Sequence, residues 1–294
     1  MKKRLLVLLF LGAFVNCLAQ ATEKWKFNTE VQGSVVDYSG SQYREGAHEI
    51  GGLLSGNYLD DGGFNLGYTR TDIKFKASLP TINQDSYSAS VRKHLYLDNV
   101  PGIITLNANG YLLNNNDSTG ATDAVNVWAT QASFASYNKL YYLDFGYARS
   151  DYRNLSVNQY TPTAGLGLFN DDGWLQLRGY FIAPSNPMLS QGIKFTQAAE
   201  AKYTHFLTPN GLFKPNNIQI AGVFGNRLYT VDMDIGSVIN LSDIQRGGLI
   251  IGAEWRLGST AKMLLQGGQN TYINRNIGDN YESRFLYLNV NTTF

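Results

Sequence analysis

Apolar and polar residues alternate along most of this chain with a period of two. In the last segment, residues 284–294, every second residue from Leu286 to Phe294 is apolar or threonine, and the residues between are mostly polar or aromatic. Successive side chains of a strand point to opposite faces, so this pattern predicts a β-strand with one apolar face and one wetter face. The same alternation recurs in residues 87–92, 141–148, 175–181 and 249–257.

Segments of this kind predict about fourteen strands, with twelve or sixteen as alternatives. They start near residues 24, 47, 64, 86, 103, 125, 140, 162, 174, 194, 218, 248, 261 and 284. Short turns are expected at 60–63, 98–102, 138–139, 170–173 and 259–260, and longer loops at 39–46, 79–85, 114–124, 150–161, 183–193, 232–247 and 273–283. Short turns on one side and longer loops on the other are typical of a transmembrane β-barrel. The sequence therefore predicts an all-β fold, an antiparallel up-and-down barrel over residues 22–294.

Three places depart from the regular pattern. The segment Thr208–Asn217 is as long as a loop although it falls among the short turns. The run Phe64–Ala77 changes parity near Thr69–Asp72, where we expect a β-bulge. The connection Asp232–Gly247 is expected to be an ordinary exposed loop, with an inward fold or a gate as the alternative.

The closing strand carries a recognisable signature. Its apolar residues Leu286, Leu288 and Val290 and its terminal Phe294 resemble the C-terminal signal of Gram-negative outer-membrane barrel proteins. In that family the barrel-assembly machinery recognises the terminal aromatic residue and the alternate apolar residues. The resemblance implies an outer-membrane location, with membrane lipid and the assembly machinery as partners. By size and strand count the chain also resembles the smaller monomeric, porin-like channels, which implies a monomer.

The N-terminal residues predict export. Positive charge in Met1–Arg4 precedes an apolar run, Leu5–Val15, and the small residues of Ala19–Ala21 suit a signal peptidase. The run is too short to span a bilayer as a helix, so residues 1–21 are predicted to be a cleaved signal peptide. Asn16 before the single cysteine, Cys17, departs from the small residue of a lipoprotein processing site, which leaves lipidation as a minor alternative.

Composition narrows the chemistry further. If cleavage follows Ala21, the remaining chain has no cysteine, which excludes disulfides, thiol catalysis and cysteine-ligated metal. The formal net charge of +1 argues against a nucleic-acid partner. No motif predicts a cofactor. Asp232, Asp234 and Asp243 echo a calcium loop, but the spacing fits poorly and we predict no metal site.

A barrel of about fourteen strands is wide enough for a water-filled lumen, so passive passage of small polar or ionic solutes is the first predicted function. The predicted lumen-lining charges are Arg92, Asp144, Arg178, Glu200, Lys202, Arg227, Glu254 and Arg256. Counting Lys26, Lys74, Lys76, Arg284, Glu30 and Asp72 inward as well leaves basic groups in excess. That excess predicts a mild preference for anions, and cross-lumen pairing that braces the wall is the alternative role.

Two other classes of function stay open. A blocked barrel could act as a structural or adhesive protein through its outer loops. A barrel lipid hydrolase would need a base beside a nucleophile, and only His94, on the same predicted face as Ser88 and Ser90, deserves inspection. Because a lone histidine on a strand is usually structural, no catalytic residue is predicted.

Overall fold

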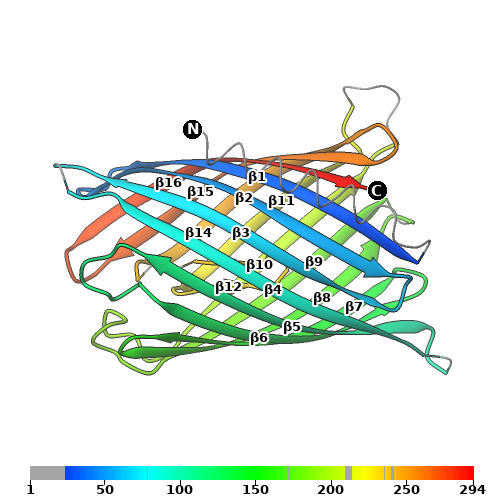
Figure 1. Ribbon diagram of the computed structural model, residues 1–294, viewed down its shortest axis with the longest axis horizontal. Coiled ribbons are helices and arrows are strands. Elements are labelled where there is room, and N and C mark those ends of the chain that lie inside the picture. The colour runs from blue at the N-terminus through cyan, green and yellow to red at the C-terminus, as the bar shows by residue number, and fades with distance from the viewer. Residues whose placement is uncertain are drawn as a thin grey trace.

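The chain folds as a closed antiparallel barrel, seen in a computed structural model (Figure 1). The structure describes residues 24–294 except 78, 98, 171, 209–213, 235 and 240–241, so the predicted signal peptide, residues 1–21, lies outside the described residues. The fourteen barrel strands are β1 (Trp25–Ser39), β2 (Arg44–Tyr58), β3 (Gly62–Phe75), β4 (Ile82–Leu97), β5 (Gly102–Asn115), β6 (Val125–Ser136), β7 (Tyr141–Tyr152), β8 (Leu155–Leu168), β9 (Gly173–Pro184), β10 (Thr196–Phe206), β11 (Asn217–Arg227), β14 (Ile244–Leu257), β15 (Ala261–Asn274) and β16 (Asp279–Thr293). A separate hairpin consists of β12 (Val231–Asp232) and β13 (Ser237–Val238).

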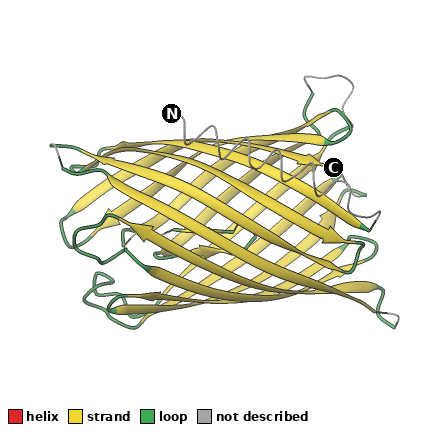
Figure 2. Ribbon diagram, viewed as in Figure 1, coloured by secondary structure: helices red, strands yellow, loops and turns green. Residues whose placement is uncertain are grey.

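Each barrel strand pairs with its sequence neighbours, and the last strand closes on the first (Figure 2). At this seam the backbone N–H of Phe294 donates to the carbonyl of Phe27 over 3.0 Å, and the N–H of Phe27 donates back over 3.1 Å. The prediction of fourteen strands and of Phe294 on the closing strand is therefore confirmed. Among the described residues no helix is long and apolar enough to cross a membrane.

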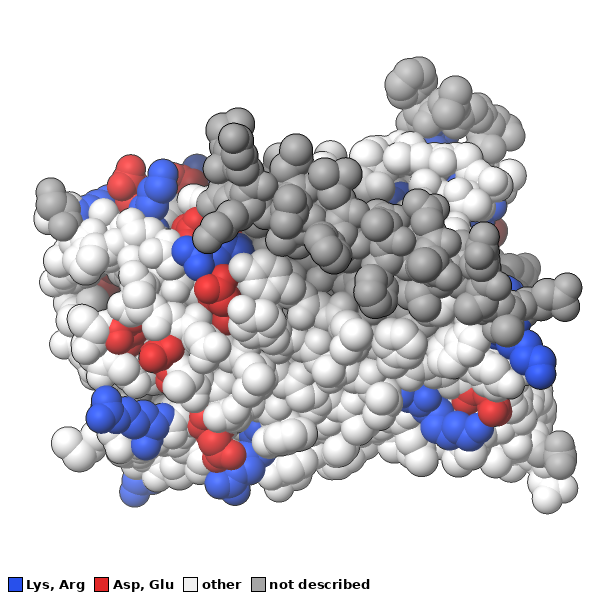
Figure 3. Space-filling model, in the orientation of Figure 1, with Lys and Arg blue, Asp and Glu red and all other residues white. Residues whose placement is uncertain are grey.

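The outer surface of the barrel carries a broad apolar band. Leu66, Val91, Leu143 and Leu288 all point outward from different strands, and each is 44–61% exposed. On the face drawn in Figure 3, charged side chains gather toward the two ends, and the part of the surface between them that the grey atoms leave visible is almost free of charge. A closed barrel satisfies its backbone hydrogen bonds internally, so this band suits a hydrocarbon surrounding and makes the barrel a membrane-spanning structure.

Beyond the apolar band the strands continue, and the pattern of faces is reversed. We call this part the loop end, because it carries the connections 40–43, 76–81, 116–124, 153–154, 185–195, 228–243 and 275–278. Here polar residues such as Asn126 and Ser156 point outward, while their neighbours Val127 and Val157 point inward and are 1% exposed. Polar side chains face water outside, and apolar side chains pack inside.

This reversal explains where the sequence-based boundaries were wrong. Residues 150–161 were expected to form a loop, but β7 and β8 run on through them and only Arg153 and Asn154 connect the strands. Likewise, the parity change near Thr69–Asp72 is not a bulge, because the register of β3 with both neighbours is continuous there. The β3 strand instead passes from the apolar band into the loop end, so its outward residues become polar without any irregularity.

Candidate functional site

The connection 228–243 folds into the barrel, which corrects the expectation of an exposed loop. Leu228, Tyr229, Thr230 and Val231 are each 4% exposed or less. Leu228, Tyr229 and Val231 pack in one cluster with inward-facing residues of β5 to β9, including Leu113, Val125, Tyr152, Val157, Tyr180 and Ile182. The reason is local: this apolar stretch follows directly on β11, and the loop end offers it an apolar interior instead of water.

The first, buried part of the connection is fixed to the barrel wall by Gln159 of β8. Its side-chain amide donates from Nε2 to the carbonyl of Val231 over 2.6 Å, and its Oε1 accepts the N–H of Val231 over 3.0 Å. Gln159 is 1% exposed. One side chain thus satisfies both backbone polar groups of a residue outside the barrel strands, as buried backbone groups require.

Ion pairs fix the hairpin β12–β13 to the barrel wall. The guanidinium of Arg178 on β9 donates from Nη2 to Asp234, and its Nη1 lies 3.5 Å from a carboxylate oxygen of Asp232. Gln131 on β6 donates to Asp234 over 3.1 Å and to Asp144 on β7 over 2.6 Å. Arg178 therefore pairs with both carboxylates that the hairpin carries into the lumen, and one negative charge of the three groups stays unbalanced.

Close packing leaves little room beneath the hairpin. The methyl end of Met233 lies directly over Gly146 of β7, so that a Cβ atom added at Gly146 would overlap it and the hydroxyl of Thr161. The absence of a side chain at Gly146 is thus what lets Met233 reach the wall.

The end of the connection, at Asp243, is held by a second buried cluster of side chains. Arg44 donates to Asp243 from Nη2 over 2.8 Å, and Asn274 and Tyr281 donate to it over 2.6 and 2.5 Å. The Arg44 guanidinium also lies 5.9 Å from the ring centre of Tyr38. Three side chains, from β2, β15 and β16, therefore bind the end of this segment, and Tyr38 of β1 packs against one of them.

The connection 185–195 covers the same part of the mouth. Ser190, Gln191 and Ile193 are buried, and Gln191 donates to the carbonyl of Ser242 over 2.5 Å. Tyr229 donates to the carbonyl of Leu189 over 3.1 Å. Burial, reinforced by the charge of Asp243, raises the pKa of Tyr229 to about 12, so this hydroxyl remains a donor at neutral pH.

The opposite wall is left uncovered. On β1 to β4 most inward-facing side chains are partly exposed, and they are mainly polar: Asn28, Glu30, Gln32, Ser34, Glu49, Asn65, Thr71, Ser86, Ser88 and Ser90. On β7 and β8 the inward-facing side chains beside the hairpin are buried almost without interruption. The inserted segment thus fills one side of the lumen.

A hollow of about 330 Å³ lies between the hairpin and the wall formed by β2 to β7. Arg92 and Asn109 belong to its wall, and Met233, Asp234 and Gly236 of the hairpin form its other side. The rest of its lining is Leu53, Asn65, Ser88, Ala89, Ser90, Asn107, Tyr111, Gln131 and Tyr142.

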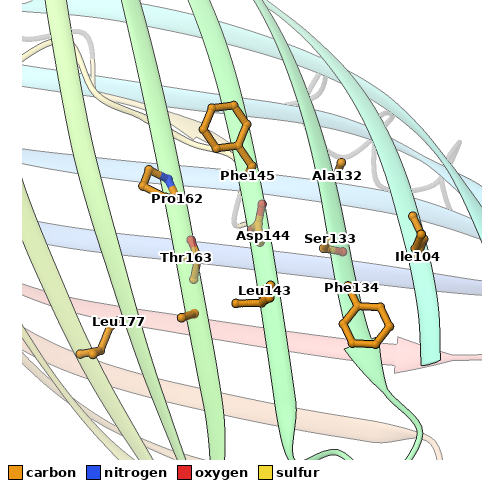
Figure 4. A pocket seen from close by; sticks show the side chains of 11 residues that line it. Ile104, Ala132, Ser133, Phe134, Leu143, Asp144, Phe145, Pro162, Thr163 and Leu177 are labelled. Atoms are coloured by element: carbon orange, nitrogen blue, oxygen red, sulfur yellow. The ribbon is translucent and has the colours of Figure 1, made fainter. Parts of the chain in front are cut away.

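A second hollow, of about 550 Å³, lies on the outer face (Figure 4). Phe134, Phe145, Pro162 and Leu177 surround it, and they point the same way as the rest of the apolar band. The β8–β9 ladder passes from the pair Tyr160–Phe181 to the pair Thr163–Arg178, so Pro162, which has no N–H, stands at an interruption. This groove opens toward lipid and not into the lumen.

The register places all eight predicted lumen-lining charges on inward positions, but it separates them into groups. Asp144 and Arg178 meet at the hairpin, and Arg92 stands across the hollow. Glu200 and Arg227 lie 3.6 Å apart on neighbouring strands, with Lys202 two residues from Glu200.

The two remaining charges lie toward the other end of the barrel. Glu254 is 3.8 Å from Lys262, and Arg256 is the next inward residue of β14. Four charges of the wider inward count are placed differently. Asp72, which pairs with His48 and Arg70, and Lys74 lie at outward positions of β3, and Arg284 points outward between Leu286 and Glu282. Lys76 lies in the connection after β3, where it donates to the carbonyl of Ser41.

The residues considered for a hydrolase, His94 with Ser88 or Ser90, are not shown in contact with each other in the structure. The Nδ1 atom of His94 lies 2.8 Å from the hydroxyl of Thr105, and Ser90 accepts a hydrogen bond from Asn65 over 2.8 Å. Asp243 is committed to Arg44, while Asp232 and Asp234 face Arg178. In the described part of the chain no group of three or more His, Cys, Asp or Glu is arranged to hold a metal ion.

The sequence matches no protein-family model and no curated protein sequence. Its structure is similar to that of a bacterial polysaccharide outer-membrane secretin, with a TM-score of 0.54 at 9% identity over 91% of this chain and 98% of the other. It is also similar to the toluene transporter TodX of Pseudomonas putida, with a TM-score of 0.54 at 8% identity over 94% and 90%. A third similar structure is a FadL homologue of Pseudomonas aeruginosa, with a TM-score of 0.52 at 9% identity over 92% and 90%. The chain thus has the closed-barrel fold of outer-membrane proteins.

Proposed function

We propose that this outer-membrane barrel is a channel for the passive passage of small polar solutes, and that the segment 228–243 is its constriction. The observation that carries the proposal is the one-sided filling of the lumen. The inserted hairpin buries the β7–β8 wall and leaves the polar residues of β1 to β4 partly exposed. Solutes would pass along this uncovered wall, where amide and hydroxyl groups can replace their hydration.

In this arrangement the excess of basic groups that predicted a mild anion preference is smaller than the sequence suggests. Arg284 does not face the lumen, and the hairpin carries Asp232 and Asp234 into it. Glu30 and Glu49 lie along the uncovered wall. We therefore propose a channel with little preference for either sign of charge, in which Arg92 is the main local exception.

A second candidate is a barrel closed by its own loops that acts as a structural or adhesive protein. The observation in its favour is the burial of Ser190, Gln191 and Ile193 over the mouth, next to the cluster around Asp243. In this case the polar wall of β1 to β4 would enclose water without a path through the barrel.

Planar-bilayer recording of the refolded protein separates the two candidates. A channel gives stable ohmic steps, and replacing residues 231–238 with a short Gly-Ser linker should enlarge them because the constriction is removed. Reversal potentials across a KCl gradient should lie near zero for a weakly selective pore. If folded barrels, identified by heat-modifiable migration, give no steps until the hairpin is removed, the native barrel is closed and the second candidate holds.

A further inference from the structure

The lumen hollow presents polar atoms that the protein does not use. The Oδ1 of Asn107 and the Nδ2 of Asn109 have no hydrogen-bond partner among the described residues. Both residues line the hollow, and Asn109 is 7% exposed. Buried polar groups are nearly always paired, because an unpaired one costs about 1–3 kcal/mol. A free acceptor and a free donor side by side therefore indicate a partner that comes from outside the chain.

The same hollow contains a cation without a matching anion. Arg92 donates to the side-chain oxygen of Asn65 over 3.2 Å and to that of Asn57, and no carboxylate of the described residues pairs with it. In contrast, the inward-facing Arg44 and Arg178 each contact a carboxylate. A half-buried guanidinium bound only to neutral amides keeps donors suited to a carboxylate or another anion.

The remaining lining indicates what else the partner carries. Ser88 and Ser90 contribute hydroxyls, Gln131 an amide, and Tyr111 and Tyr142 contribute phenol rings. Such a surface offers both donors and acceptors, which suits a molecule with several hydroxyl groups more than an apolar one. The volume of about 330 Å³ lies at the lower end of the range of about 300–1,000 Å³ typical of small-molecule sites.

The one acidic residue of the lining, Asp234, is itself part of an ion pair. Asp234 is held by Arg178 and accepts a hydrogen bond from Gln131 over 3.1 Å. Asp234 thus has a cationic partner on the wall side of the hairpin, whereas Arg92 has no carboxylate partner among the described residues on the other side of the hollow.

We propose that this hollow binds a small polyhydroxylated carboxylate, a solute of the sugar-acid class. Its carboxylate binds Arg92, and its hydroxyl groups bind Asn107, Asn109 and the serine hydroxyls. The inference rests on the proposed channel function, since the solute reaches the hollow through the lumen. The site thereby adds a specific solute class to a passage that is otherwise unselective.

Isothermal titration of the refolded barrel in detergent, at fixed ionic strength, tests the site directly. Gluconate is the probe, and sorbitol, which has the same carbon chain with a hydroxyl in place of the carboxylate, is the matched neutral control. Because hydrogen bonds to a charged group are worth more than neutral ones, gluconate should bind at least about tenfold more tightly than sorbitol. Equal affinity for the two, or no binding of gluconate, would overturn the proposal.

Two variants test the role of Arg92, with migration on unheated gels as the check of folding. Arg92→Gln should reduce gluconate affinity to that of sorbitol. Ser88→Asp leaves Arg92 in place and should weaken gluconate alone, since it adds a negative charge to the hollow. Lys262→Gln, which removes an inward positive charge from β15 on the opposite wall, is the control for general electrostatics. If it weakens gluconate as much as Arg92→Gln does, the assignment of the carboxylate to Arg92 is wrong.

Bilayer recording of the same preparation separates this proposal from the channel function. Ohmic steps without gluconate binding retain the channel and remove the site. Gluconate binding without steps retains the site as a receptor in a closed barrel and removes the channel. Where both are present, millimolar gluconate should reduce the current more than sorbitol does, and Arg92→Gln should abolish the difference.

Discussion

In the membrane-embedded part of this barrel the outward side chains are apolar and the inward ones polar, whereas at the loop end the two faces exchange their character. Leu143 and Asp144 illustrate the first arrangement, and Ser156 and Val157 illustrate the second, on adjacent strands. The period of two is the same in both regions. What differs is the surrounding medium: lipid outside and water inside in one case, and water outside and packed protein inside in the other. Alternation therefore identifies faces, and only the surroundings decide which face is apolar.

The strongest test of this comparison places a charge on each face of the loop end. Val157→Asp puts a carboxylate into the cluster that holds the inserted segment and should reduce the free energy of unfolding by about 4 kcal/mol. Ser156→Asp, one residue away and outward, should change it by less than about 0.5 kcal/mol. Urea unfolding in lipid vesicles measures both. Similar losses for the two variants would contradict the reversal of faces.

The next largest effect concerns the cluster around Asp243. Asp243→Asn removes the charge partner of the mostly buried Arg44 and should cost about 3 kcal/mol. The exposed pair of Arg149 and Asp151 is the matched control: Asp151→Asn should cost no more than about 0.5 kcal/mol. Protease cleavage within 228–243 gives a second measurement, because only the first variant should release the segment. A loss no larger than that of the control would mean that the cluster does not hold it.

A smaller effect is expected where the hairpin meets the wall. Gly146→Val places side-chain atoms where Met233 now lies, and overpacking of this kind costs about 1–3 kcal/mol. The hairpin should move away from β7, and single-channel conductance should rise. Gly267→Val, at an outward position of β15, is the control and should leave conductance unchanged. Unchanged conductance in Gly146→Val would mean that the hairpin does not set the width of the passage.

The smallest predicted effect concerns a connection that does not enter the lumen. Partial burial acts to raise the pKa of Asp117, but hydrogen bonds from Thr119 and Thr122 outweigh it and hold this pKa below the ordinary value of 3.8. A lowered folded-state pKa contributes stability that is present above pH 3.8 and is lost as the pH falls through the folded pKa. The protection of the Thr119 and Thr122 amides, relative to their intrinsic exchange rate at each pH, should therefore fall only below about pH 4. In Asp117→Asn this acid-induced change should disappear, and an identical change there would exclude Asp117 as its origin.

Much of the fold was predictable from the sequence, because a membrane forces its outward residues to be apolar at every second position. This constraint gave the strand count and the closing strand with Phe294. At the loop end no such constraint exists, and strands there resemble loops: residues 150–161 and 273–283 were assigned to loops although most of them extend strands. Where a strand passes from lipid to water, its outward residues change from apolar to polar, and in the sequence this change looks the same as a β-bulge.

The site was predictable only in part for a related reason. Parity places Arg92, Asp144 and Arg178 on inward positions without knowledge of the structure. It does not show that Arg178 is neutralised by Asp234 and Arg92 is not, since this depends on where a segment distant in sequence comes to lie. Gln159, which binds the backbone of Val231, was missed because a single inward glutamine resembles any other lumen residue.

The seam between Phe27 and Phe294 joins the first and last strands of the barrel, almost the whole chain apart. Every other strand pair can form between neighbours in the sequence, whereas this pairing must wait until the final residue is available. Until then β1 presents a free edge fifteen residues long, which in an exported chain is open to pairing with other chains. The pairing of β16 with β1 therefore ends the period of greatest risk of aggregation, and a chain that lacks this last strand would keep the edge of β1 open.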